Sequence, residues 1–363
     1  MEGPKNPSDK EFSKVLDFLN KSLRKDCSWS IDKEYPTALN LNNRHNMNIV
    51  WDDQNIVSHA VLKPLIIKSP HVIYKLGAIG SVVTDENYRN QGWSTKIIQK
   101  CNQLALEQSC DVTILWTNLY EFYQKMGFEL AGYEMSFVID KDFSYDRTLF
   151  RYSSEKNISP EAIAKLYSQH TVSTVRTIEE IRKFIQIPNT HLYTAWNSQG
   201  NLAAYAVEGK GIDLQNYIHE WGGSVPAIVN LLGYIKDQKP SGFTFISPKT
   251  SVNLNSKLIE LSTISNVGYL GMIKIINFDQ LSQKIKKAFR NLGVSDIVLE
   301  KHADYYLFGC GQDLCTLQKE SELVQLLFGP VEFSELNVFQ TNTIEKLKLI
   351  LPLPFWVWGW DSI

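Results

Sequence analysis

One stretch, residues 78–128, constrains the fold most, because it joins a strand to a helix through a basic turn that contains a glycine. Leu76–Thr84 (LGAIGSVVT) is apolar and β-branched, which is typical of a buried strand. The turn Arg89–Ser94 (RNQGWS) follows, and apolar residues then recur at helical spacing. The first N–H groups of a helix have no partner within it, and the peptide dipoles make that end positive. This segment therefore predicts an anion site of the kind that binds a pyrophosphate.

Three side chains of the turn fit such a site. Gly92 has no Cβ, so the backbone there can approach a phosphate closely. Ser94 is small and keeps the next turn open, and Arg89 adds a fixed positive charge with several N–H donors. The pattern is short, however, and by itself it is also compatible with a turn that has only a structural role.

A second strand and a short helix come next. Asp111–Trp116 (DVTILW) predicts the strand, and Asn118–Phe128 predicts a helix that is closed by a glycine. Tyr123 lies within this helix and is the candidate proton donor. Its alternative role is that of an aromatic core residue beside the phenylalanines of the same segment.

Together the two motifs resemble the GNAT (GCN5-related N-acetyltransferase) family, in which R-x-x-G-x-[GAS] follows the central strand and Y-x-x-x-G-F follows the next. Both motifs match in order and at the family spacing. In that family the strand and turn hold acetyl-CoA, and the tyrosine protonates the departing CoA thiolate. The resemblance implies that Tyr123 is the general acid. It also implies that acetyl-CoA is bound by Val82, Val83, Arg89, Gln91, Gly92, Trp93, Ser94 and Thr95.

Composition limits the partners and the compartment. Lys+Arg total 37 against 39 Asp+Glu, a formal net charge of −2 without a basic block, which argues against nucleic acid as the main partner. The five cysteines form no C-x-x-C motif, so we expect no metal site and a reducing compartment. The first residues lack an apolar signal segment, and no apolar run reaches about eighteen residues. The sequence predicts a soluble, cytoplasmic protein without stable membrane insertion, and it leaves a homo-oligomer open.

The length of 363 residues suits two or three domains, and residues 1–146 are the predicted catalytic one. The S-x-x-E box Ser8–Glu11 predicts a helix start, a hairpin leads to the central strand, and Met135–Ile139 is expected to close the sheet. Cys27–Asn43 has no clear period. In GNAT proteins that region borders the substrate, and a structural or disordered loop is the alternative.

Residues 147–265 repeat the same order of elements: two capped helices, a hairpin, a strand, a glycine turn and a helix. The second turn has Glu220 near it and contains no arginine, so the anion chemistry does not repeat. We therefore expect a degenerate second GNAT-like domain that does not bind CoA. An unrelated α/β domain of similar order is the alternative.

Residues 266–363 predict a third, small α/β domain that begins with a strand at Leu270–Asn277 and a helix at Asp279–Phe289. Two GNAT units followed by such a domain resemble the Eis-type acetyltransferases, whose third domain is sterol-carrier-like. The expected fold class is therefore α/β (α+β): tandem GNAT domains, each a mixed and mostly antiparallel sheet flanked by helices, and then a sterol-carrier-like domain.

The last residues, 351–363 (LPLPFWVWGWDSI), carry three of the nine tryptophans. We expect this aromatic surface to dock on the protein or on a partner; a membrane-surface tail would normally bring basic residues, and none follows Lys348. In Eis-type enzymes the C-terminal carboxylate reaches the first active site as a base. The resemblance implies that role for the Ile363 carboxylate, with Asp361 as an additional group. A tail that only packs between domains is the alternative.

The predicted reaction is direct transfer of an acetyl group from acetyl-CoA to a primary amine of a small molecule or peptide. A backbone N–H of the strand Leu76–Thr84 is expected to hold the oxyanion, and no metal is required. Two other classes stay open: a non-catalytic CoA-binding sensor or scaffold, and a lipid carrier in which the GNAT units are relics. The intact Arg89 and Gly92 argue against the lipid carrier.

Overall fold

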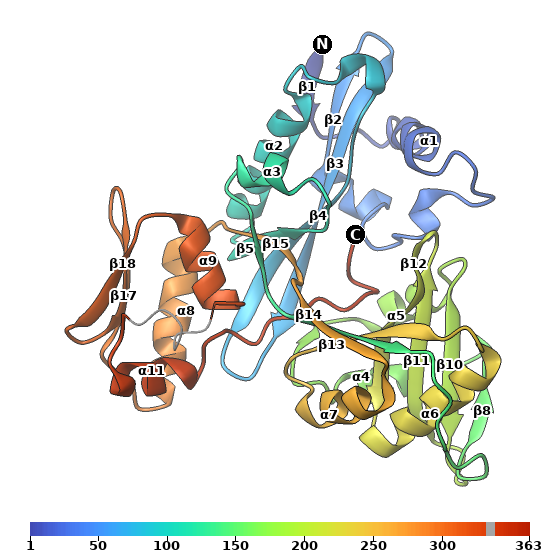
Figure 1. Ribbon diagram of the computed structural model, residues 1–363. Coiled ribbons are helices and arrows are strands. Elements are labelled where there is room, and N and C mark those ends of the chain that lie inside the picture. The colour runs from blue at the N-terminus through green and yellow to red at the C-terminus, as the bar shows by residue number, and fades with distance from the viewer. Residues whose placement is uncertain (332–337) are drawn as a thin grey trace.

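The computed structural model describes residues 1–331 and 338–363, and in this part of the chain helices pack on three β-sheets (Figure 1). Residues 332–337 of the predicted third domain lie outside the described residues. The first sheet has the order β1-β2-β3-β4-β5-β15-β6, and β9 pairs with β3. Its strands are β1 (Glu2–Lys5), β2 (Met47–Asp52), β3 (Asn55–Lys68), β4 (Ile73–Thr84), β5 (Val112–Leu115), β6 (Glu129–Ala131), β9 (Ser173–Thr174) and β15 (Gly271–Ile275).

Helices α1 (Phe12–Leu23) and α2 (Trp93–Glu107) cover opposite faces of the first sheet. Neighbouring residues of a strand point to opposite faces, and in β2 Ile49 packs with α1 whereas Val50 packs with α2. The Ser8 N–H donates to the Glu11 carboxylate at 2.8 Å, but α1 begins one residue after Glu11 and no side chain caps its start, so the predicted capping box is only half formed. The remaining helices of this part are α3 (Tyr120–Gln124) and the 3₁₀ helices η1 (Ile31–Lys33), η2 (Leu41–Asn46) and η3 (Glu86–Tyr88).

The second sheet has the order β14-β7-β13-β12-β11-β10-β8, with helices α4 to α7 packed around it. Its strands are β7 (Glu134–Ile139), β8 (Arg151–Ser153), β10 (His191–Trp196), β11 (Leu202–Lys210), β12 (Asp213–Gly223), β13 (Phe243–Pro248) and β14 (Ile264–Gly268). The helices are α4 (Pro160–Tyr167), α5 (Ile178–Ile185), α6 (Val225–Gln238) and α7 (Val252–Leu261).

The two sheets repeat one topology. In each, a strand leads through a helix to a parallel neighbour: β4 through α2 to β5, and β12 through α6 to β13. The helix starts differ, because the Ser224 hydroxyl accepts from the Ala227 N–H at 3.4 Å at the start of α6. In the second sheet a side chain thus satisfies part of the helix end that α2 leaves open.

Two strands lie in a different sheet from the one that the sequence predicted. Met135–Ile139 was expected to close the first sheet, but β7 pairs with β13 and β14 in the second. Leu270–Asn277 was expected to begin the third domain, but β15 lies between β5 and β6 of the first sheet. An apolar strand pattern fixes which side chains are buried and leaves the partner strand undetermined, so the local sequence could not distinguish these pairings.

The third part is a three-stranded sheet, β16-β17-β18, with α8, α9 and α11. Its elements are α8 (Phe278–Asn291), β16 (Ile297–Lys301), β17 (Tyr306–Cys310), β18 (Asp313–Leu317), α9 (Glu320–Phe328) and α11 (Thr341–Lys348). One apolar cluster continues from this part through both larger sheets, so the three parts share a core.

The end of the chain runs between the first and second sheets (Figure 1). Trp356, Trp358 and Trp360 are at most 1% exposed. The Trp358 indole N–H donates to the carbonyl of Val172 at 2.9 Å. The aromatic tail is therefore part of the protein core.

Candidate active site

Strand β4 has a bulge near the middle of the first sheet. Ser81 has φ +48°, and the register with β3 shifts between Val61↔Gly80 and His59↔Val83. His59 Nδ1 lies 2.9 Å from the Ser81 carbonyl oxygen, and burial lowers the pKa of His59 to about 4. The ring is therefore neutral near pH 7, and its Nδ1–H donates to that carbonyl.

Beyond the bulge, β4 and β5 separate. They pair in parallel through Leu76↔Val112, Gly77↔Thr113 and Ala78↔Ile114, whereas β4 continues to Thr84 with no further β5 partner. The β5-facing backbone of residues 79–83 can therefore pair with an extended ligand.

The turn after β4 leaves the start of α2 open. Gly92 has φ +78° and is the residue before α2, and an added Cβ would meet no atom within 4 Å. The backbone conformation itself thus favours glycine, and the space in front of the helix is free. Lys96 N–H donates to the Gly92 carbonyl as the first backbone bond of α2, so the N–H groups of residues 93–95 point to this space. The Ser94 and Thr84 hydroxyls bond to each other at 2.9 Å and join the turn to the end of β4.

A cavity of about 620 Å³ lies at this opening. Gln91 does not line it, and the Gln91 side-chain oxygen accepts from the Trp93 indole N–H at 3.3 Å. The other seven predicted cofactor residues do, together with the predicted acid: Val82, Val83, Arg89, Gly92, Trp93, Ser94, Thr95 and Tyr123. The open start of α2, the free edge of β4 and the Tyr123 side chain thus meet in one cavity.

Tyr123 packs among aromatic residues and also borders the 620 Å³ cavity. Its ring is 6% exposed and packs edge-on against Phe122 and Phe128, with centroids 5.0 and 5.9 Å away. Its hydroxyl has no hydrogen-bond partner among the described residues, and the residue lines the 620 Å³ cavity. Burial raises the pKa of Tyr123 to about 12, so the hydroxyl carries its proton at neutral pH.

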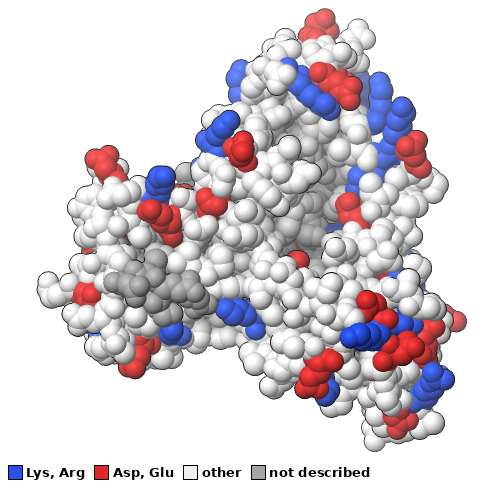
Figure 2. Space-filling view, in the orientation of Figure 1, with Lys and Arg blue, Asp and Glu red and all other residues white. Residues whose placement is uncertain are grey.

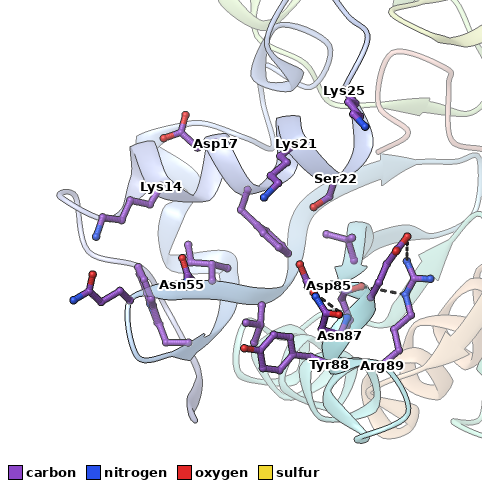
Figure 3. A pocket seen from close by; sticks show the side chains of 18 residues that line it. Lys14, Asp17, Lys21, Ser22, Lys25, Asn55, Asp85, Asn87, Tyr88 and Arg89 are labelled. Carbon is purple, nitrogen blue, oxygen red and sulfur yellow. Dashed lines mark hydrogen bonds and ion pairs between the residues drawn. The ribbon is translucent and has the colours of Figure 1, made fainter.

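A second, larger groove of about 940 Å³ adjoins this cavity. Figure 3 shows its walls: side chains of α1 lie on one side and residues 85–89 on the other. Both cavities include Ser22 and Arg89, so they are continuous around the turn. The Arg89 side chain is 59% exposed and lies 3.7 Å from Glu86, and an exposed pair this long is weak. Arg89 can therefore turn towards an anion.

The end of the tail lies against the β4 bulge. A Cβ built on Gly80 would be 2.6 Å from the carboxyl carbon of Ile363 and 2.8 Å from its oxygen. Gly80 comes just before the residues of β4 that line the 620 Å³ cavity. The structure thus brings Ile363 to the same strand as the predicted cofactor residues.

Two buried cations fix the tail in this position. Lys210 is 1% exposed, and its ammonium donates to the carbonyls of Gly359 at 2.9 Å, Trp360 at 3.2 Å and Ser362. Burial lowers the pKa of Lys210 to about 8. Arg176 donates to Asp361 and to Glu220, each at 2.7 Å, with all three side chains at most 2% exposed.

Asp361 is therefore not available as an additional base. The sequence suggested that it would assist the Ile363 carboxylate, but its carboxylate is buried against Arg176 and anchors the tail. Sequence reasoning also missed Arg176 and Lys210 themselves. The available signal was a lysine at the end of a largely apolar strand, LAAYAVEGK, since a buried charge is usually paired.

The comparisons with known proteins agree with this geometry. Residues 4–131 match the family model described as an acetyltransferase (GNAT) domain. Three solved structures match nearly the whole chain. A probable N-acyltransferase from Enterococcus faecalis is 13% identical, with 95% of both chains covered and a TM-score of 0.62. A GCN5-related N-acetyltransferase from Anabaena variabilis is 14% identical, with 94% of this chain and 95% of that chain covered and a TM-score of 0.63, and Eis1 from Mycobacterium abscessus is 11% identical, with 94% of both chains covered and a TM-score of 0.57. No curated protein sequence matches the chain.

The family match places a GNAT acetyltransferase domain in the first part of the chain, which supports an acyltransferase. Domains of this family use acetyl-CoA as co-substrate. The solved structures extend the likeness to an Eis-like fold over the rest of the chain, although at these identities they describe the fold alone. The predicted family and fold class are thereby confirmed.

Residues 1–331 and 338–363 contain neither a membrane-spanning helix nor a cluster of metal-ligating side chains. None of the helices there is long and apolar enough to cross a membrane. No group of three or more His, Cys, Asp or Glu residues there is arranged to hold a metal ion.

Proposed function

We propose that the protein transfers an acetyl group from acetyl-CoA to a primary amine of a small molecule or peptide. The observation that carries the proposal is the 620 Å³ cavity, where an open helix start, an unpaired strand edge and the Tyr123 hydroxyl meet. Acetyl-CoA supplies the acetyl group as a thioester. Each part of acetyl-CoA has a matching feature in the site. N–H groups can donate to its phosphates, a strand edge can pair with its amides, and a phenol can protonate its sulfur.

The phosphates fit the turn. The free N–H groups of residues 93–95, the positive end of α2 and Arg89 attract an anion, and the space in front of Gly92 accepts it. Each contribution at an exposed helix end is about 0.3–1 kcal/mol, so the amides and Arg89 act together. The extended amide-containing arm pairs with the free edge of β4 over residues 79–83.

Tyr123 is the proposed acid. When the new C–N bond forms and the C–S bond breaks, the sulfur leaves as a thiolate and takes the phenol proton. Burial raises the pKa of Tyr123 to about 12. The same burial raises the basicity of a thiolate in this cavity, since both anions lose solvation, and transfer between them therefore stays balanced.

The Ile363 carboxylate is the proposed base. An alkylammonium must lose a proton before its nitrogen can attack, and the carboxyl carbon lies beside Gly80, next to the opening between β4 and β5. Lys210 and Arg176 act as positioning residues, because they hold the tail through its carbonyls and Asp361.

Substitution of Tyr123 tests the proposal. Tyr123→Phe should lower kcat by roughly 10²- to 10⁴-fold and leave acetyl-CoA affinity unchanged. Tyr120→Phe is the matched control, because Tyr120 lies on the same helix and is 45% exposed. An unchanged kcat in Tyr123→Phe would exclude this residue as the acid. Acetyl-CoA binding without turnover on any primary amine would instead favour the CoA-binding sensor.

The cofactor site and the base have separate tests. Arg89→Glu combined with Gly92→Asp puts negative charge against the phosphates, so calorimetry should show weaker acetyl-CoA binding. Residues appended after Ile363 move the carboxylate but leave every side chain in place. Full kcat in that extended protein would refute the proposed base, even if removal of the last two residues were damaging.

A further inference from the structure

A third cavity, of about 300 Å³, lies between the first and second sheets beside the end of the tail. Trp116, which directly follows β5, and Ile363, which lies beside Gly80 of β4, border it from the first sheet. Glu134, the first residue of β7, and Ile246 of β13 border it from the second. Trp116 and Gly80 flank the place where β4 and β5 separate, so this cavity lies on the tail side of that opening.

The surroundings of this cavity are mostly uncharged. Figure 2 shows a hollow in the middle of the face where the parts of the molecule meet, and its walls are mainly neutral residues. The apolar and aromatic residues that line the 300 Å³ cavity include Trp116, Ile246, Leu270, Trp356 and Val357. A volume at the lower end of the usual range for ligand pockets suits a small, largely apolar molecule.

The charged residues of the lining leave one carboxylate without a partner. Asp213 accepts from the Tyr35 hydroxyl and lies 3.3 Å from the Arg24 guanidinium, and the Lys210 ammonium is held by three tail carbonyls. Glu134 is partly buried, and its side chain has no hydrogen bond or ion pair among residues 1–331 and 338–363. Burial raises the pKa of Glu134 to about 7, as expected for a carboxyl without a nearby cation.

We propose that this cavity binds the acceptor and that the acceptor is a small diamine, whose reacting primary amine is joined by a short apolar or aromatic body to a second ammonium that pairs with Glu134. The inference rests on the proposed function for the identity of the reacting end. The ligand would supply the cation that Glu134 lacks, and its apolar body would cover the tryptophan walls. A monoamine would leave the partly buried Glu134 carboxylate without a cation, which is unfavourable.

Glu134 is thus a specificity-determining residue, distinct from the proposed acid and base. Glu134 lies on the second sheet. Ile363 and Tyr123 instead lie near β4 of the first sheet. An ammonium at Glu134 and a reacting nitrogen at the Ile363 carboxylate would place the two ends of one molecule on opposite walls. This arrangement predicts recognition of two cationic ends with a nonpolar centre.

The test compares 1,4-bis(aminomethyl)benzene with 4-ethylbenzylamine, which has the same shape but carries a methyl group in place of the second ammonium. Calorimetric binding to the whole protein, with CoA present and absent, measures recognition without turnover. We expect the diamine to bind the unsubstituted protein about tenfold to hundredfold more tightly than the monoamine, the range for a hydrogen-bonded charge. Glu134→Gln should remove that difference, and Glu134→Asp should restore part of it. Asp213→Asn is the matched control in the same cavity and should keep the preference.

Each outcome decides the question. Equal affinity for the two amines, or an undiminished diamine preference in Glu134→Gln, would overturn the proposal. A kcat in Glu134→Gln that falls equally for both amines would also overturn it, because Glu134 would then act as a base. Diamine binding that depends on Glu134 but is followed by no coenzyme release would support this inference and refute the proposed acetyl transfer. Transfer to monoamines with no diamine preference would do the opposite.

Discussion

Gly80→Ala should move the end of the tail without touching the proposed acid or the turn. The added Cβ would lie 2.6 Å from the carboxyl carbon of Ile363 and 2.8 Å from its oxygen. Ordinary carbon contacts are about 3.5–4.0 Å, so the carboxylate must shift by about 1 Å. A misplacement of about 1 Å in a catalytic group can cost about 10²-fold, and we expect kcat for a primary amine to fall by about that factor.

The assay is steady-state thiol release, with acetyl-CoA affinity measured by calorimetry and Tm by calorimetric scan. Both should change little, because Gly80 lies within a strand, where alanine is tolerated. Gly268→Ala in β14 is the matched control, since the nearest atoms to its added Cβ are 3.9 and 4.0 Å away. Full kcat in a stable Gly80→Ala protein would refute the assignment of the base to the Ile363 carboxylate. Weakened acetyl-CoA binding would show that the methyl group acts on the cofactor side.

Two further predictions concern buried charges. Arg176→Met leaves Asp361 and Glu220 without their cation, and urea unfolding should show that the free energy of unfolding falls by about 3–5 kcal/mol. The control is Arg182→Met. Arg182 pairs with Glu179, both side chains are more than half exposed, and this substitution should lower the free energy of unfolding by less than about 1 kcal/mol. A similar loss in both variants would contradict the importance of burial. The pKa of Glu134 is raised to about 7, so the folded state retains a proton between pH 4.5 and 7 that the unfolded state releases, and stability falls as pH rises through that window. Glu134→Gln has no such titration, so its free energy of unfolding relative to the unsubstituted protein should rise by about 2 kcal/mol from pH 5 to pH 8. One pKa unit is about 1.4 kcal/mol, and the partial exposure of Glu134 reduces the full effect. An advantage that is independent of pH would place the Glu134 carboxylate in a more solvated environment.

The grouping of residues around the 620 Å³ cavity could be predicted because its signals are local. Strand β4, the Gly92 turn and the start of α2 are adjacent in the sequence, and Tyr123 follows one strand later. In such a segment the apolar period, the glycine and the basic residue determine the conformation within a short window. The role of Gln91 could not be separated from that of its neighbours, because side-chain direction within a turn depends on contacts such as the one with Trp93.

The tail attachment and the strand exchange could not be predicted from local pattern. Arg176 and Asp361 are 185 residues apart, and nothing near either one specifies its partner. The β7 segment has the same apolar alternation in either sheet, and only long-range pairing distinguishes them. Glu134 at the start of that strand became a candidate only when the second sheet and the tail were both in place around it.

The position of β15 bears on how a nascent chain matures on the ribosome. β6 joins the first sheet through β15, and the Lys274 ammonium donates to the Met126 carbonyl at 2.5 Å, just after the helix that carries Tyr123. Synthesis from β6 to the end of β15 takes roughly 7 to 30 seconds at about 5–20 residues per second. During that interval the apolar edge of β5 has no neighbour on one side, which is a hazard for aggregation. The segment that carries the family signature, residues 4–131, thus acquires a complete sheet only after the whole second sheet has been translated.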